Sequence, residues 1–417
     1  MYVPRPRMPV SRPPVNAWLT QRRIVLYSSV TLALYGLFFV AWTGINRRFP
    51  EFDVVQPGPD FAVFWSASYL ALHGAPWQAY DLHLLADLVL TRLSDFQREN
   101  FIAWLYPPTY LLMVTPLALL PFSVAYPYFI GASLLGYVIA ARRISGAASI
   151  HRTPGLGCVP LVASPCIFVT AIFGQNAILT AACAALAVYW VDKKPIHAGI
   201  CIGLLSAKPQ MALLFPFVLI AVRAWRTLAS AAVSAILLAA IAVLVCGVES
   251  VRLFAVNAEL ARTLILEHGV VFWFVSPTPF AALRLSDVPL SYAYTWHGSV
   301  AVVAVAAACS VWRRTRDTRL RGAALFVSTL ISNPYLWHYE LAWLGIALAC
   351  VVTLGLRDGW LPGEQAAAIC AWLLPVYEML NPWLEFPQIG PIVLLFMLLA
   401  ILRRTRITAQ NASLGGA

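Results

Sequence analysis

The chain has 417 residues, of which 60% are hydrophobic and 11% are charged, and its mean hydropathy is +0.75. Soluble domains carry roughly 25% charged residues, so this composition excludes a soluble globule and indicates a protein with several membrane-spanning helices. Lysine and arginine outnumber the acids 29 to 18, an excess that is typical of cytoplasmic loops and gives little support to nucleic-acid binding.

The first 23 residues are rich in proline and arginine and predict a disordered cytoplasmic tail. The apolar run 24–45 that follows is long enough to span the bilayer and lacks a small-residue cleavage site. We expect it to lead outward into a long first external loop, residues 46–103. Within this loop, 61–72 and 82–93 have helical spacing with mixed polarity, which is typical of helices that lie at the membrane interface.

Residues 104–141 are apolar but contain five prolines, and they are too long for one helix across a hydrocarbon core of about 30 Å. Two crossings would place Arg142 and Arg143 outside, whereas one crossing plus a broken or re-entrant half would keep them inside. We favour the single crossing, because backbone freed by proline is tolerated where it lines a cavity inside the protein.

The later apolar runs alternate with basic loops at 192–194, 223–226, 313–321 and 403–406. This alternation predicts a second external loop at 248–297 and a cytoplasmic tail from 407. The expected fold is an all-α bundle of about 12 spanning helices, formed by a single domain over 24–406, with both chain ends in the cytoplasm.

This topology places a set of polar side chains on the external face: Asp60, Gln175, Asn176, Lys208, Arg284, Asn333, His338 and Glu340. Ionisable residues at the ends of apolar helices are costly, and they usually have a partner or a function. We therefore regard this set as the source of candidate site residues.

Asp60 lies in the stretch 58–81, next to a cluster of aromatic residues. Aromatic rings stack on the apolar faces of sugars, and a carboxylate can accept the proton of a hydroxyl, so the stretch suits sugar chemistry. The alternative is an interfacial aromatic belt with an acid in water.

The remaining candidates also have two interpretations each. Lys208, between two apolar runs, either extends to the interface or binds a phosphate as a point charge. Arg284 could contact a phosphate through two hydrogen bonds. His338 is either a helix-end histidine or a phosphate donor or acid–base group, and Gln175 is either a satisfied amide or a sugar ligand.

The sequence contains no P-loop, no GxGxxG motif and no Asp-x-Asp pair of the kind that nucleotide-sugar transferases use. The eight cysteines lie mostly in apolar runs and have no CxxC spacing. We expect neither a metal nor another cofactor. An outward-facing membrane enzyme without a nucleotide site needs a donor that the membrane delivers, and a lipid-linked phosphosugar meets that need.

Several short motifs resemble those of glycosyltransferase family 87. In chain order they are Gly58-Pro59-Asp60-Phe61, Tyr106-Pro107-Pro108, Gly174-Gln175-Asn176, Lys208-Pro209 and Asn333-Pro334-Tyr335-Leu336-Trp337-His338-Tyr339. The resemblance spans roughly residues 24–345. It implies a GT-C fold and a metal-independent, inverting transfer from a polyprenyl-monophosphate sugar, since the family includes polyprenol-phosphate-mannose-dependent α-mannosyltransferases.

The resemblance also assigns roles. Asp60 matches the family's general base, and His338 looks like its histidine near the donor phosphate. Lys208 and Gln175 match other polar positions, and Tyr106 and Asn333 lie in motifs expected to contact the donor. Glu340 departs from the family, in which Asp or a second His often lies nearby.

The predicted function is a membrane hexosyltransferase at the external face of the inner membrane, with mannose as the first choice of sugar. The donor would be a polyprenyl-phosphate sugar and the acceptor an envelope glycolipid or glycan. The alternatives are a transporter or flippase of lipid-linked glycans, and a GT-C transferase of another sugar such as arabinose. Most charges lie at the ends of apolar segments instead of mid-helix, which favours the enzyme.

Overall fold

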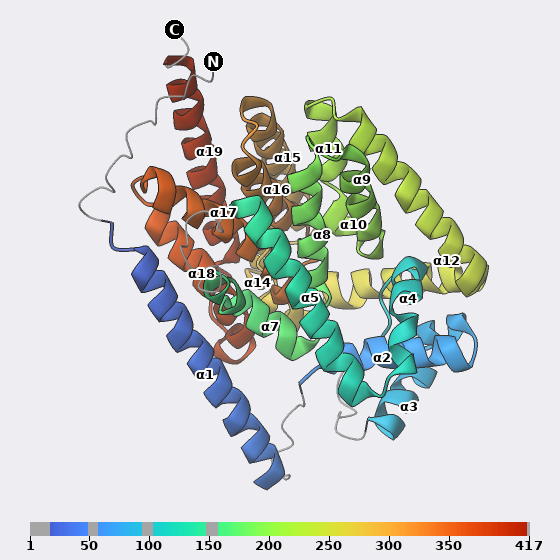
Figure 1. Cartoon of the computed structure of the whole chain (residues 1–417). Coiled ribbons are helices and arrows are strands. Elements are labelled where there is room, and N and C mark those ends of the chain that lie inside the picture. The colour runs from blue at the N-terminus through green and yellow to red at the C-terminus, as the bar shows by residue number, and fades with distance from the viewer. Residues whose placement is uncertain (1–16, 49–56, 94–102, 147–156, 415–417) are drawn as a thin grey trace, which may run out of the picture.

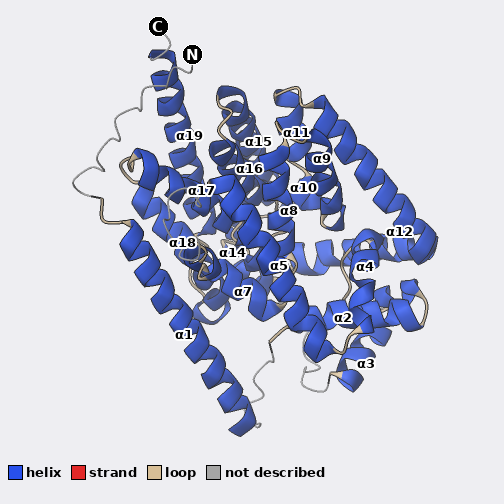
Figure 2. Ribbon diagram, viewed as in Figure 1, coloured by secondary structure: helices blue, strands red, loops and turns tan. Residues whose placement is uncertain are grey.

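The computed structural model describes residues 17–48, 57–93, 103–146 and 157–414, and all regular structure in these ranges is helical (Figure 2). This confirms the predicted all-α class. The first half of the chain forms α1 (Gln21–Arg48), α2 (Pro59–His73), α3 (Leu82–Arg92), α4 (Pro108–Val114), α5 (Phe122–Ser145), α6 (Val159–Val162), α7 (Pro165–Phe173), α8 (Ala177–Trp190), α9 (Pro195–Leu204), α10 (Pro209–Ala212) and α11 (Phe215–Ala221).

The second half forms α12 (Trp225–Leu260), α13 (Val270–Val275), α14 (Pro279–Leu285), α15 (Leu290–Arg314), α16 (Thr318–Ser332), α17 (Ala342–Asp358), α18 (Glu364–Leu384) and α19 (Gly390–Leu414). Short 3-10 turns at Pro76–Tyr80, Thr115–Leu119, Leu205–Ala207 and His338–Leu341 and a π-helical turn at Ala261–Glu267 connect them. Because α19 continues to Leu414, most of the predicted C-terminal tail is helical. The predicted N-terminal tail lies mainly outside the described residues.

Five segments of the described chain are long and apolar enough to cross a membrane: Gln21–Trp42, Phe122–Ser145, Trp225–Glu267, Leu290–Arg314 and His338–Asp358. Other apolar helices, such as α8, are shorter than the roughly 20 residues that a span requires. Two prolines interrupt α18. The count of about 12 crossings therefore stays a prediction.

Several helices begin where the sequence places proline. Pro59, Pro165, Pro195, Pro209 and Pro279 each lie in the first turn of a helix. Proline is favoured there because the backbone N–H that it lacks would have no partner within the helix. Its fixed φ also suits the first turn of a helix. The predicted helices at 61–72 and 82–93 correspond to α2 and α3.

The proline-rich range 104–141 contains one long helix. α5 has 24 residues and is about 36 Å long, whereas α4 has seven residues and ends in a 3-10 turn. The range thus contains one candidate span and one short helix, and the expected single crossing stays a prediction. On which side of the membrane the ends lie stays a prediction.

The predicted second external loop, 248–297, is largely helical. α12 continues through it after a kink at Gly247, where φ is 81°. Figure 1 shows the first, yellow-green part of α12 descending along one side of the bundle and the yellow second part turning inward. Asn257 on this second part donates to the backbone carbonyls of Tyr80 and Trp104, at 3.0 and 3.2 Å. The turned segment is thus tied to the region between α2 and α4.

The core around the site is built on α8, which is rich in alanine and packs against α5, α16 and α17. Small residues let neighbouring helices approach closely. Hydrogen bonds add to this packing: Trp343 Nε1 donates to Thr180 Oγ1 at 3.1 Å, and the Tyr137 hydroxyl donates to the Ala342 carbonyl at 3.0 Å. These contacts fix the first turn of α8 and the middle of α5 against the start of α17.

Basic side chains gather at one end of the bundle. Arg143, Lys193 and Lys194 line a common hollow. Nearby loops are linked by an ion pair between Arg321 and Asp192, at 3.1 Å, and by a bond from Arg313 to a backbone carbonyl of α11. Under the positive-inside rule this end would be the cytoplasmic one, which stays a prediction.

Candidate active site

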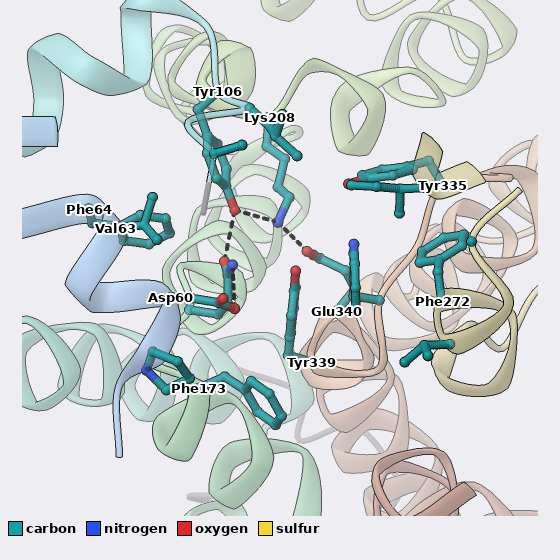
Figure 3. Close-up of a pocket in the computed structure, with 18 of the residues that line it drawn as sticks. Asp60, Val63, Phe64, Tyr106, Phe173, Lys208, Phe272, Tyr335, Tyr339 and Glu340 are labelled. Atoms are coloured by element: carbon teal, nitrogen blue, oxygen red, sulfur yellow. Dashed lines mark hydrogen bonds and ion pairs between the residues drawn. The ribbon is translucent and has the colours of Figure 1, made fainter. Parts of the chain in front are cut away.

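A cavity of about 1130 Å³ lies where α2, the segment before α4, the α7–α8 turn, the start of α10 and the 3-10 turn before α17 meet. Figure 3 shows Asp60, Tyr106, Lys208 and Glu340 pointing toward one another in it. These four residues come from four separate parts of the chain. The cavity therefore has a polar centre that only the folded bundle can assemble.

Two glycines place Asp60. Gly58 and Gly174 both have left-handed backbones, with φ of 92° and 76°. A Cβ on Gly174 would lie 2.5 Å from the Cβ of Phe61 and 3.2 Å from the Cα of Gly58, so only glycine allows this close approach. The Gly58 N–H donates to the Ile172 carbonyl at 2.6 Å. The start of α2 is thereby held against the α7–α8 turn.

This contact brings Asp60 to Gln175. Gln175 Nε2 donates to Asp60 Oδ2 at 2.9 Å, and Gln175 Oε1 accepts from the Tyr106 hydroxyl at 2.9 Å. One amide therefore connects the carboxylate to the tyrosine and fixes the direction of both. Asp60 also lies in the first turn of α2, where the helix dipole favours a negative charge.

Lys208 lies at the N-terminal cap of α10 and is 6% exposed. Its ammonium forms a buried ion pair with Glu340. It also donates to Asn176 Oδ1 at 3.2 Å and to the Tyr106 hydroxyl at 3.5 Å. The three ammonium hydrogens thus have three oxygen partners inside the protein. Lys208 is not a side chain that extends to the membrane surface.

The electrostatics of Asp60 follow from its surroundings, and α2 lies outside the five candidate spans. Burial is the main cause that raises the pKa of Asp60 to about 6, and the Glu340 carboxylate acts in the same direction. The hydrogen bond from Gln175 and the Lys208 charge oppose this shift. A carboxylate with a pKa near neutrality is suited to accept a proton from a weakly acidic group.

Aromatic side chains form part of the cavity wall. The rings of Phe272 and Tyr335 stack with centroids 5.2 Å apart, and those of Trp337 and Tyr339 stack at 6.0 Å. Phe64 lies on the opposite side, beside Asp60 (Figure 3). Such ring faces and edges can hold the apolar faces of a sugar.

The cavity is apolar toward α1 and α18. Phe38 and Trp42 of α1 line this part together with Met379, Leu380 and Trp383 of α18. Phe38 and Leu380 are 43% and 41% exposed. This part of the cavity can therefore hold an apolar chain.

Three predicted site residues are not among those that line the cavity. Arg284 donates to the carbonyls of Val288 and Glu267, at 2.7 and 3.3 Å, and stacks on Trp273. Asn333 donates to the carbonyls of Gln210 and Thr329, at 3.1 and 3.0 Å. Both side chains donate hydrogen bonds to backbone carbonyls in this structure.

His338 is buried, and its ring packs edge-on against Phe173 with centroids 4.7 Å apart. Neither ring nitrogen has a hydrogen-bond partner among the described residues. Its neighbours Trp337 and Tyr339 line the cavity. The catalytic role expected of His338 stays a prediction.

Glu340 belongs to the external polar set that the sequence predicts, but the sequence assigned it no role in the site. It is 2% exposed, lines the cavity and forms an ion pair with Lys208. The available signal was the lysine itself, because a lysine between apolar runs requires an acidic partner. In the described ranges, no three His, Cys, Asp or Glu side chains come together as a metal site.

Comparison with known proteins gives one result. The model of glycosyltransferase family 87 matches residues 104–334, which is more than half of the chain. This range contains Tyr106, Gln175 and Lys208. No curated protein and no solved structure gave a match. The chain therefore belongs to glycosyltransferase family 87 and is a membrane glycosyltransferase.

Proposed function

We propose that this glycosyltransferase moves a hexose, with mannose as the first choice, from a polyprenyl-monophosphate sugar to an envelope glycolipid or glycan. The supporting observation is the hydrogen-bonded series Asp60–Gln175–Tyr106–Lys208–Glu340 in a cavity whose far wall is apolar. The series contains a base and a cation that can bind phosphate, and the apolar wall can hold a lipid chain. The GT-C fold is part of the proposal.

In the proposed reaction, Asp60 accepts the proton of the acceptor hydroxyl while the hydroxyl oxygen attacks the anomeric carbon of the donor sugar. The bond between that carbon and the phosphate oxygen breaks, and the lipid monophosphate leaves with the electron pair. Lys208 binds the phosphate as a point charge. Gln175 and Tyr106 hold the base in position. His338 would lie near the donor phosphate, as an acid–base group or a donor to the phosphate.

The decisive experiment uses purified protein with a panel of polyprenyl-phosphate sugars and an envelope lipid extract as acceptor. Sugar transfer, followed by mass spectrometry, is the expected result. Accumulation of one polyprenyl-phosphate sugar in a deletion strain would identify the donor. Movement of a lipid-linked glycan across vesicles without any transfer would instead support a flippase.

The proposed orientation places the site at the external face of the inner membrane. Ser286 and Thr318 lie beyond opposite ends of α15, whose 25 residues span about 37 Å. In a background without native cysteines, a cysteine at Ser286 or Leu384 should be labelled by an impermeant reagent added from outside. A cysteine at Thr318 should be labelled only after the membrane is opened. Labelling of Thr318 in intact cells would contradict the orientation. Gln56 and Ser149, which the same topology places on the external and the cytoplasmic face, lie outside the described residues.

The pKa of Asp60 predicts how activity depends on pH. Only the deprotonated carboxylate accepts a proton, so kcat/KM should rise about tenfold per pH unit below pH 6 and level off above it. Lys208→Met removes a charge that lowers the pKa of Asp60, so the rising limb should move to higher pH. The pH profiles of both purified proteins test this. A flat profile between pH 5 and 8 would exclude Asp60 as the titrating base.

A further inference from the structure

Resting on the proposed function, we propose that Glu340 makes the cavity favour a singly charged phosphodiester over a doubly charged phosphomonoester, and thereby expels the spent lipid phosphate. The sugar donor is a diester with one negative charge. The product is a monoester, whose second ionisation near pH 6 gives it close to two charges at neutral pH. The two lipids differ in charge at the same place.

The first observation is the charge of the cavity. Three lining residues are a carboxylic acid or a basic amine: Asp60, Lys208 and Glu340. The lysine and Glu340 balance each other in a buried ion pair. Asp60 is left as an added negative charge whenever it is ionised. A phosphate therefore enters a site in which Lys208 is already neutralised.

The second observation is that Lys208 has no unused hydrogen. Its partners are Glu340, Asn176 at 3.2 Å and the Tyr106 hydroxyl at 3.5 Å. An incoming phosphate must replace one of them, and the long bond to Tyr106 is the weakest. The phosphate then shares the ammonium with the Glu340 carboxylate. Repulsion between the two anions grows with the charge of the phosphate.

The third observation is the second oxygen of Glu340. Its Oε2 is buried and has no hydrogen-bond partner within the described part of the chain. The negative charge of Glu340 is therefore offset by Lys208 alone, and no second donor weakens its repulsion of a neighbouring anion. If Glu340 served only to hold Lys208, both of its oxygens would be expected to have donors.

The test compares two short lipid probes, farnesyl phosphate and its methyl ester, which differ in charge at the phosphate. Binding to purified protein is measured at pH 8, where the monoester carries two charges. Wild-type protein should bind the methyl ester at least about tenfold more tightly than the monophosphate. In Glu340→Gln the monophosphate should bind more tightly than in wild type, and the preference should fall below about threefold.

Glu378→Gln is the matched control. Glu378 is equally buried and accepts from Gln388 at 2.7 Å, but it does not line the cavity. This variant should keep the wild-type preference. Because Glu340→Gln leaves Lys208 without its counter-ion, the double variant Lys208→Met/Glu340→Gln provides a second neutral site. It should bind both probes weakly and without preference.

The outcomes separate the two proposals. An unchanged preference in Glu340→Gln, or equal binding of both probes by wild type, would overturn the role of Glu340 and leave the proposed transfer intact. Failure of wild type to bind either probe would overturn the lipid-phosphate donor, and the role of Glu340 with it. Strong product inhibition by farnesyl phosphate in Glu340→Gln, with little in wild type, would support the proposal further.

Discussion

Replacing Asp60 by asparagine should give a folded, membrane-inserted protein that still binds the lipid donor but transfers sugar at least about 100-fold more slowly. A sugar hydroxyl is a poor nucleophile, and removing its proton as the bond forms is typically worth about 10²- to 10⁴-fold. Asparagine keeps the size of the side chain and can still accept a hydrogen bond from Gln175, but it has no basicity. The rate of transfer with saturating donor is the measurement.

Asp87→Asn is the control for this variant. Asp87 lies on α3, is exposed and does not line the cavity, so its replacement should leave the rate unchanged. Asp53, an acid seven residues before Asp60 that could also serve as a control, lies outside the described residues. A wild-type rate in Asp60→Asn would make Asp60 a structural acid of the first turn of α2. The base would then have to be Glu340, Asp81 or His338.

Replacing Lys208 by methionine should lower kcat/KM about 10- to 100-fold, because a charge-assisted bond to the phosphate is lost. It should also lower the free energy of unfolding by about 3–5 kcal/mol, since Glu340 would remain as a buried, unpaired charge. The two effects can be separated. Lys208→Met/Glu340→Gln should recover much of the stability without recovering donor affinity.

The controls for Lys208 use another lysine of the same chain. Lys193 is exposed at the basic end of the bundle, where it stacks on Tyr189, and Lys193→Met should change neither activity nor stability. Thermal unfolding in detergent and donor titrations measure the two quantities. Full activity in purified Lys208→Met would remove the lysine from the donor site.

The sequence was sufficient to find part of the polar centre. Asp60, Gln175, Lys208 and Tyr106 are polar residues in apolar surroundings or short turn motifs, and all four line the cavity. The same criterion also selected Arg284. In the sequence, an isolated arginine that binds a ligand cannot be distinguished from one that donates hydrogen bonds to backbone carbonyls. In the structure Arg284 donates to two backbone carbonyls, one of them 17 residues away in the chain.

Other features could not be predicted because they depend on contacts between distant segments. The pairing of Lys208 with Glu340 joins residues 132 positions apart. The contact between Gly58 and Gly174 is equally remote, although each glycine is visible in its motif. The number of spans could not be predicted because several helices are short or interrupted by proline. One apolar run in the sequence therefore does not correspond to one crossing.

The pairing of Lys208 and Glu340 also constrains how the protein is made. During synthesis Lys208 leaves the ribosome long before its partner: at about 5–20 residues per second, the 132 intervening residues take roughly 7–26 s. Over that interval the ammonium has Asn176 and Tyr106 as its available partners, because both precede it in the chain. Membrane insertion of the second half thus supplies the acid that pairs with Lys208. A chain truncated before Glu340 would keep an unpaired lysine, which membrane-protein quality control could recognise.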